Sequence, residues 1–171
     1  MIKEKRVLTV REATEDDAVS LAPRLRYADL TEIYAVRGRD ACTVEALLVG
    51  VNSPGGCYVA VDEDDVPQII LGTYPSGDPM VGYIWMMGSE ALVKYRTQLF
   101  KETHGLLHKI GSKYPVLTNM VHSDNKVHIR WIQWAGFVIL REVYFNGHRF
   151  YEFARLMTHA QIKRNQECVI R

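Results

Sequence analysis

A histidine and a serine stand side by side where they could move protons. His122 and Ser123 follow an apolar run at 116–121 and precede Asp124 and Asn125, residue types that favour the start of a helix. Because a neutral imidazole near pH 7 can take a proton from an amine, His122 and Ser123 are candidate catalytic residues. A structural role for His122, hydrogen-bonded beside a helix cap, stays open.

The other reactive side chains lack the pattern of a site. Cys42, Cys57 and Cys168 are odd in number and lack the spacing of metal ligands, which is typical of ordinary thiols in a reducing compartment. The acidic run at 62–65 is too short for a calcium loop and indicates a solvated turn. Gly-x-Ser-x-Gly, Walker and zinc-ligand patterns do not occur, so we expect no metal and no hydrolase or nucleotide triphosphatase.

Composition indicates one globular domain. The chain has 171 residues, 47% hydrophobic and 24% charged, which suits a core that needs neither disulfides nor metals. The formal net charge of +1 argues against nucleic acid as a partner. Since no run approaches 18 apolar residues, we expect no membrane association and a cytoplasmic location. We assign 1–157 to a single domain and 158–171 to a C-terminal extension.

Periodicity predicts an α/β fold, of the α+β kind with a mixed sheet. Apolar residues at intervals of three or four predict a long helix between Ser89, which can cap it, and Gly111. The strands on either side of that helix should run parallel, because it forms a crossover connection. Asn146-Gly147 predicts a tight hairpin. The expected strands are 7–11, 57–61, 67–74, 81–87, 116–122, 137–145 and 148–157. The other expected helices are 14–25, 43–51 and 126–134, with Thr43 as the cap of the second. The segment 30–36 is expected to be helix or turn.

This order of elements, with the stretch from Asn125 to Phe137, resembles the GNAT superfamily of acyl-CoA-dependent N-acyltransferases. Many of those enzymes carry Asn, a small residue, an apolar-Tyr pair and Gly-Phe at fixed spacing; the same positions here are Asn125, His128, Trp131, Ile132, Gly136 and Phe137. The resemblance implies a GNAT-like, mostly antiparallel twisted sheet of six to seven strands with about four helices.

The resemblance also implies where acetyl-CoA would bind. In GNAT enzymes the fourth and fifth strands splay apart, and strand amides hold the pantetheine arm and polarise the acyl carbonyl. Those amides correspond to Met86, Met87 and Gly88. The family counterpart of Asn125 contacts the pantetheine, although Asn125 can equally cap the helix at 126–134.

Two departures from the family pattern affect binding and catalysis. The glycines that usually cradle the pyrophosphate are replaced by Lys94 and Arg96, which either bind the phosphates through their side chains or form the solvated face of a helix. The Tyr that usually protonates the leaving thiolate is replaced by Ile132, which transfers no protons. Acid–base groups must then come from His122, Ser123 or a small set of others: Glu90, His128 and Tyr83.

A narrower resemblance concerns the second half of the chain. Residues 124–130, Gly136-Phe137 and the hairpin glycine Gly147 look like a small GNAT-like family of short-tailed bacteriophages that is associated with virion assembly. Two readings therefore stand: an N-acetyltransferase in which an amine attacks acetyl-CoA directly, and a non-catalytic phage protein that binds a phage or host partner. The second reading allows a location in host cytoplasm or virion, and the aromatic C-terminal half allows a homodimer.

Overall fold

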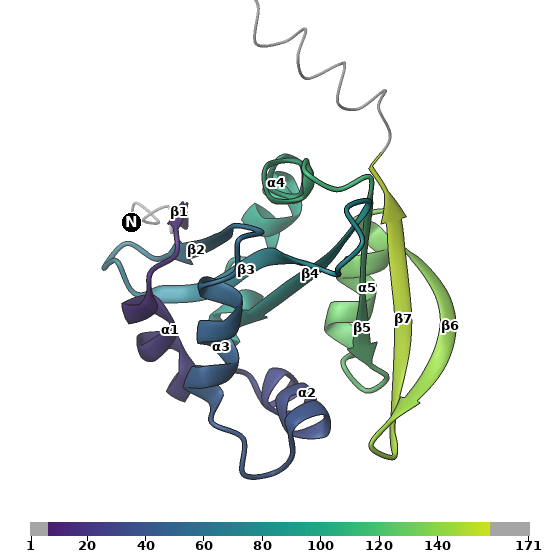
Figure 1. Ribbon diagram of the computed structural model, residues 1–171. Helices are drawn as coiled ribbons and strands as arrows, with labels where there is room; N and C mark the ends of the chain where they lie inside the picture. Colours follow the sequence, from purple (N-terminus) through teal and green to yellow (C-terminus); the bar gives the residue numbers. More distant parts are fainter. Residues whose placement is uncertain (1–6, 158–171) are drawn as a thin grey trace, which may run out of the picture.

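The computed structural model describes residues 7–157 (Figure 1), so the expected extension at 158–171 and Cys168 lie outside the described residues. The strands are β1 (Thr9–Glu12), β2 (Cys57–Val61), β3 (Pro67–Pro75), β4 (Val81–Gly88), β5 (Val116–His122), β6 (Val138–Phe145) and β7 (His148–Leu156). The helices are α1 (Glu15–Leu21), α2 (Tyr27–Arg37), α3 (Thr43–Val51), α4 (Arg96–Gly111) and α5 (Lys126–Trp134), with 3₁₀ turns η1 (Ala22–Arg24) and η2 (Glu90–Val93).

All seven strands form one sheet in the order β1-β2-β3-β4-β5-β7-β6. Every neighbouring pair is antiparallel except β4 and β5, which are parallel, as expected for strands joined by the α4 crossover. The predicted mixed, mostly antiparallel sheet is therefore confirmed. The described residues contain five α-helices rather than about four, because the segment left as helix or turn at 30–36 is the helix α2.

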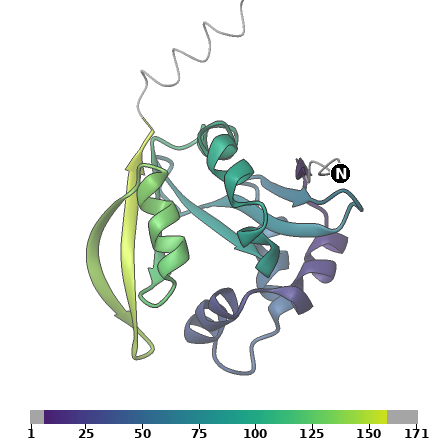
Figure 2. The same ribbon diagram turned by 180° about the vertical axis from the view of Figure 1, so that it is seen from behind.

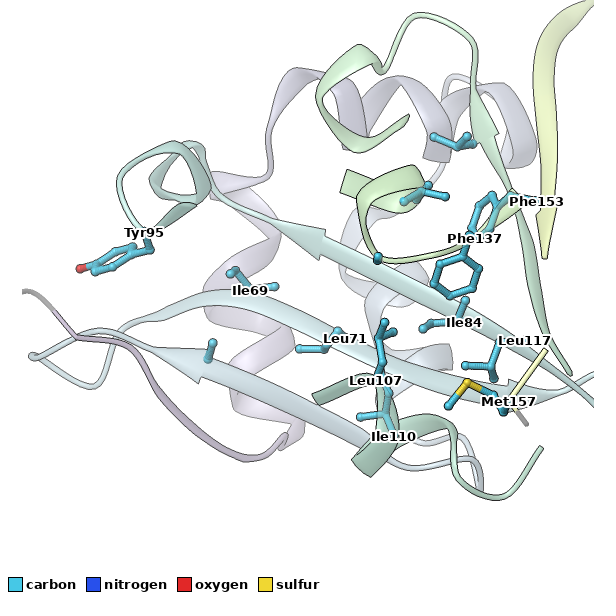
Figure 3. Close-up of a cluster of buried hydrophobic side chains, with 14 of the residues drawn as sticks. Ile69, Leu71, Ile84, Tyr95, Leu107, Ile110, Leu117, Phe137, Phe153 and Met157 are labelled. Atoms are coloured by element: carbon cyan, nitrogen blue, oxygen red, sulfur yellow. The ribbon is translucent and has the colours of Figure 1, made fainter. Parts of the chain in front are cut away.

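Helices cover both faces of the sheet. The helices α1, α2 and α3 lie on one face, and α4 and α5 lie on the other (Figures 1 and 2). Two cores result because alternate strand residues point to opposite faces: Val59 and Ile70 pack toward α1–α3, whereas Ile69 and Leu71 pack toward α4 and α5. In the second core Phe137 meets Phe153 edge to face at 5.3 Å (Figure 3).

Most helix starts and turns follow the predicted chemistry. Thr14 forms a capping box with Asp17, and the Asn146-Gly147 turn has both φ angles positive, at 49° and 78°. Two cap predictions are wrong. Cys42 stands at the cap of α3, so Thr43 is already helical. Ser89 caps η2 rather than α4, because one 3₁₀ turn precedes the long helix.

The strands β4 and β5 pair over only three residues and then diverge (Figure 1). Val81–Tyr83 pairs with 116–118; beyond this point β4 stays with β3 and β5 stays with β7. At the point of divergence the Asn119 side-chain amide donates to the carbonyl of Ile84 at 2.7 Å. The sheet therefore opens as a V between β4 and β5. Between residues 7 and 157, no helix is both long and apolar enough to cross a membrane.

Candidate functional site

A cavity of about 370 Å³ passes through the V between β4 and β5. Its walls come from α2 and α3 on one face of the sheet and from α5 on the other, with β4, β5 and β7 between them. This volume is within the range of small-molecule sites. The cavity therefore joins the two faces of the sheet at the opening that the GNAT resemblance implies.

Only one of the three predicted β4 amides is available to a ligand in this opening. The carbonyl of Ile84 and the amide and carbonyl of Gly88 all face away from β3, since their partners lie on β5 and α2. Main-chain groups of alternate strand residues face the same side, so Met86 also faces the opening and Met87 faces β3. The Gly88 amide already donates to Asp29 at 2.9 Å. Met86 is therefore the free donor.

A buried ion pair holds the end of β4. Asp29, 1% exposed, accepts two bonds from the Arg26 guanidinium at 2.7 and 3.0 Å besides the one from Gly88. The Arg26 amide donates in turn to the Gly88 carbonyl at 2.9 Å. Sequence reasoning missed this pair; its signal was an Arg three residues before an Asp at a helix start. It fixes β4 against α2, which forms one wall of the cavity.

Glu32 is a second carboxylate that sequence reasoning missed. It projects from α2 into the cavity wall, and its Oε1 accepts from the His122 amide at 3.1 Å and from the Asn125 side chain at 2.9 Å. Burial, reinforced by the charge of Asp29, raises the pKa of Glu32 to about 7. A carboxyl with this pKa can hold or release a proton near neutrality.

His122 and Ser123 are buried at the end of β5 but do not line the cavity. The His122 ring packs edge-on against Phe150, and its Nδ1 accepts from the Asp124 amide at 3.2 Å. The Ser123 main chain is bonded to Arg149 and to the Lys126 ammonium. Their assignment as catalytic residues stays a prediction. In the structure His122 contributes its main-chain amide, which orients Glu32.

Asn125 caps α5, as one of the two predicted roles requires. Its Oδ1 accepts from the His128 amide, and its Nδ2 donates to Glu32. A contact to pantetheine stays a prediction, because Asn125 does not line the cavity. His128 does line it, and burial lowers the pKa of His128 to about 4, so this imidazole is neutral at pH 7.

A second cavity of about 250 Å³ lies between α4 and α5. It shares four lining residues with the first cavity, Leu71, Met86, His128 and Trp131, so the two cavities adjoin at the strand residue whose amide is free. Arg96, the first residue of α4, and Arg130, on α5, line it. Lys94 does not. Its ammonium lies 4.8 Å from the centre of the Tyr95 ring.

Lys94 also acts on the acidic turn at 62–65. Burial opposes the change, but the Val66 amide, Gln68 and the Lys94 charge together lower the pKa of Asp62. Asp62 accepts from the main chain of that turn at Asp64 and Val66, as a solvated turn requires. Of the predicted pair of basic residues, Arg96 alone therefore faces a cavity.

The remaining reactive groups form no further centre in the described part of the chain. No three His, Cys, Asp or Glu residues between 7 and 157 are close enough to hold a metal ion. Cys42 and Cys57 are free thiols, and burial raises the pKa of Cys57 to about 12. A thiol held protonated in this way is a poor nucleophile, as expected of an ordinary core cysteine.

Comparison with solved structures identifies the architecture. A GCN5-related N-acetyltransferase from Kribbella flavida has a TM-score of 0.67 at 19% identity, covering 88% of this chain and 98% of that one. Ard1 from Thermoplasma volcanium has a TM-score of 0.65 at 15% identity, covering 88% and 98%. The chain has the GNAT fold. A further GNAT-fold neighbour, AAC(6')-Ib in complex with ribostamycin and coenzyme A, has a TM-score of 0.62 at 18% identity over 88% and 93%. Neither protein-family models nor curated proteins give a match.

At the α5 position where the resemblance implies a tyrosine, the side chain is apolar. Ile132 is 3% exposed and lines the cavity beside the V. No hydroxyl projects from α5 at this point, since the residues on either side are Trp131 and Gln133. The carboxyl of Glu32 faces the cavity from the opposite wall, where the guanidinium of Arg37 also lies.

Proposed function

We propose that this protein is an acyl-CoA-dependent N-acetyltransferase that transfers an acetyl group from acetyl-CoA to an amine by direct attack. One observation carries the proposal: Met86, on β4 beyond the point where this strand leaves β5, lines both cavities. The cavity between α4 and α5 would receive the cofactor arm, and the cavity on the α2 side would receive the acceptor. Neighbours of the same fold that contain coenzyme A support this assignment.

The Met86 amide would stabilise charge on the thioester carbonyl. When the amine attacks, negative charge develops on the carbonyl oxygen, and a fixed backbone donor lowers the energy of that state without reorganising. The surroundings of Met86 are largely apolar, with Leu71 and Trp131 in both cavities, which strengthens this interaction. Gly88 does not share the task because Asp29 already accepts from its amide.

Arg96 and Arg130 would bind the cofactor phosphates in place of the missing glycine turn. A guanidinium pairs with phosphate through two charge-assisted hydrogen bonds. Both residues line the cavity from opposite sides, one on α4 and one on α5. Neither has an ion-pair partner among the described residues. Two side chains would thus provide contacts that backbone amides provide in other members of the fold.

Calorimetry and thermal shift with acetyl-CoA and with CoA test the proposal. We expect binding, and at 100 times the dissociation constant a stabilisation of about 2.7 kcal/mol. Arg96→Ala and Arg130→Ala should each weaken binding about tenfold, because each loses a charge-assisted contact. Lys94→Ala is the matched control and should bind like the wild type. If millimolar acetyl-CoA produced neither heat of binding nor a thermal shift, acetyl-CoA-dependent transferase activity would be excluded.

A second candidate function, assembly with a phage or host protein or with a second copy, is favoured by the edge strand β6. This strand ends the sheet, and Val138, Leu140 and Tyr144 on it are all more than half exposed. A cytoplasmic or virion location would fit either function. Light scattering of the purified chain and particle yield from a phage lacking the gene test this candidate; a monomer and a normal yield would count against it.

A further inference from the structure

The side of the cavity beyond Met86 determines which acceptor fits. If the acetyl carbonyl lies at Met86, as the proposed function requires, the attacking nitrogen must approach from the wall formed by α2 and α3. Glu32 projects from that wall, and its Oε1 is held by two donors from β5 and α5. Among the described residues, no donor is bonded to Oε2. The Oε2 atom of Glu32 is therefore free to accept a hydrogen bond from an N–H group of the substrate.

The charges around Glu32 come from three elements. Asp29 and Arg26 face Glu32 from the start of α2. The charge of Asp29 raises the pKa of Glu32, and the charge of Arg26 lowers it. His128 on α5 is neutral near pH 7, and His122 on β5 presents its amide. Among the described residues, the Glu32 carboxyl therefore forms no direct ion pair with a cationic side chain. Its ability to take a proton near pH 7 is the property expected of a general base.

Most of the remaining wall on this side is apolar, and its polar members, Tyr74 and Asn119, carry no carboxylate. Val36 and Val49 come from the two helices, Trp85 from β4 and Met120 from β5. Besides Glu32, the one charged side chain in the wall of this cavity is Arg37, at the exposed end of α2. A second positive charge on the acceptor would find no carboxylate here and would meet a guanidinium.

We infer that Glu32 is the general base and that the acceptor is a primary amine carried on a single apolar body, such as an arylalkylamine, rather than a polycation. Glu32 takes one proton from the ammonium, and the freed nitrogen forms a C–N bond to the acetyl carbon while the C–S bond breaks. The second proton on nitrogen passes to the CoA thiolate through solvent. Glu32 then returns its own proton to solvent, so that amide, free CoA and one proton are the products. This inference rests on the proposed function.

The acceptor class is tested by comparing kcat/KM for 2-phenylethylamine and for spermidine, with acetyl-CoA saturating and thiol release as the readout. We expect 2-phenylethylamine to be favoured at least tenfold. Val36 lies one helical turn from Glu32, so Val36→Glu adds a second carboxylate to the same wall and should shift the ratio at least tenfold toward spermidine. Val19→Glu, on α1 and outside both cavities, should leave the ratio unchanged.

The base is tested by Glu32→Gln. We expect kcat to fall 10²-fold or more at pH 7 and the rise of kcat/KM with pH to disappear, while acetyl-CoA affinity stays unchanged. Glu32→Asp should recover part of the rate. The matched control Glu45→Gln, an exposed carboxyl outside both cavities, should behave like the wild type.

The outcomes separate this inference from the proposed function. Failure to bind acetyl-CoA overturns both. Acetyl-CoA binding combined with a preference for spermidine, with no transfer to 2-phenylethylamine, or with a wild-type rate in Glu32→Gln overturns only the inference.

Discussion

Glu32 should lower the stability of the fold at neutral and alkaline pH. Its pKa is about 7 in the folded chain, against 4.5 for an ordinary glutamate. A carboxyl whose folded-state pKa is raised contributes stability below its unfolded pKa, and this contribution is lost as the pH rises through the folded value. The difference, at about 1.36 kcal/mol per pKa unit, corresponds to about 3 kcal/mol above pH 7. The carboxyl also faces a cavity open to water, so this is an upper figure.

Glu32→Gln removes the titration and keeps an oxygen to accept from His122 and Asn125. We expect the variant to match the wild type within about 1 kcal/mol at pH 5 and to exceed it by up to about 3 kcal/mol at pH 8. For a chain of this size that gain corresponds to a melting temperature roughly 6–12 °C higher. The loss of stability in the wild type would then be the consequence of keeping a base in an apolar cavity.

Urea unfolding at pH 5, 6, 7 and 8 measures this difference, with Glu45→Gln as the control that should show none. A constant difference between Glu32→Gln and wild type across these pH values would refute the reasoning, because it would mean that Glu32 titrates alike in the folded and unfolded chain. A less stable variant at pH 8 would show instead that the ionised carboxylate stabilises the fold.

Three further predictions concern the parts that shape the opening. Asp29→Ala leaves the Arg26 guanidinium buried without a partner and should cost about 3–5 kcal/mol in urea unfolding, so a loss below about 1 kcal/mol would argue against the ion pair. Gly50→Ala would place a Cβ 2.1 Å from the Trp85 ring; we expect about 1–3 kcal/mol of destabilisation and altered indole fluorescence, whereas an unchanged spectrum would contradict the contact. Gly147→Ala, at φ +78°, should cost about 1–2 kcal/mol in the same unfolding assay, and a neutral result would mean that the hairpin turn relaxes.

The strands and turns were predictable because their signals are local. The apolar, β-branched and aromatic runs along β2, β3 and β4, and the Asn146-Gly147 pair, depend only on near neighbours in sequence. The end of β1 was less accurate, since Glu12 pairs with Tyr58 although no apolar alternation reaches it. The helix α2 was left undecided because it buries Asp29 beside Ile33, which breaks the apolar stripe that marks an amphipathic helix.

The site was predicted only in outline. The divergence of β4 and β5 followed from the fold resemblance, and the cap at Asn125 followed from residue type, whereas a ligand contact at Met86 stays a prediction. Glu32 could not have been found in this way, because its partners His122 and Asn125 lie 90 and 93 residues away along the chain. The choice among Met86, Met87 and Gly88 also depends on tertiary contacts, since Asp29 decides which amide stays free.

The helix α2 is bonded to both sides of the V. It is attached to β4 through Asp29 and to β5 through Glu32, and the hairpin residue Asn146 donates to its Ala35 carbonyl at 3.0 Å. Because β4 and β5 pair over only three residues, this helix adds a second connection that couples the motion of the two half-sheets. Substitutions along α2 would therefore change how strongly the motions of the two half-sheets are coupled. An acceptor bound against α2 would in turn make the whole sheet more rigid, rather than one wall of the cavity alone.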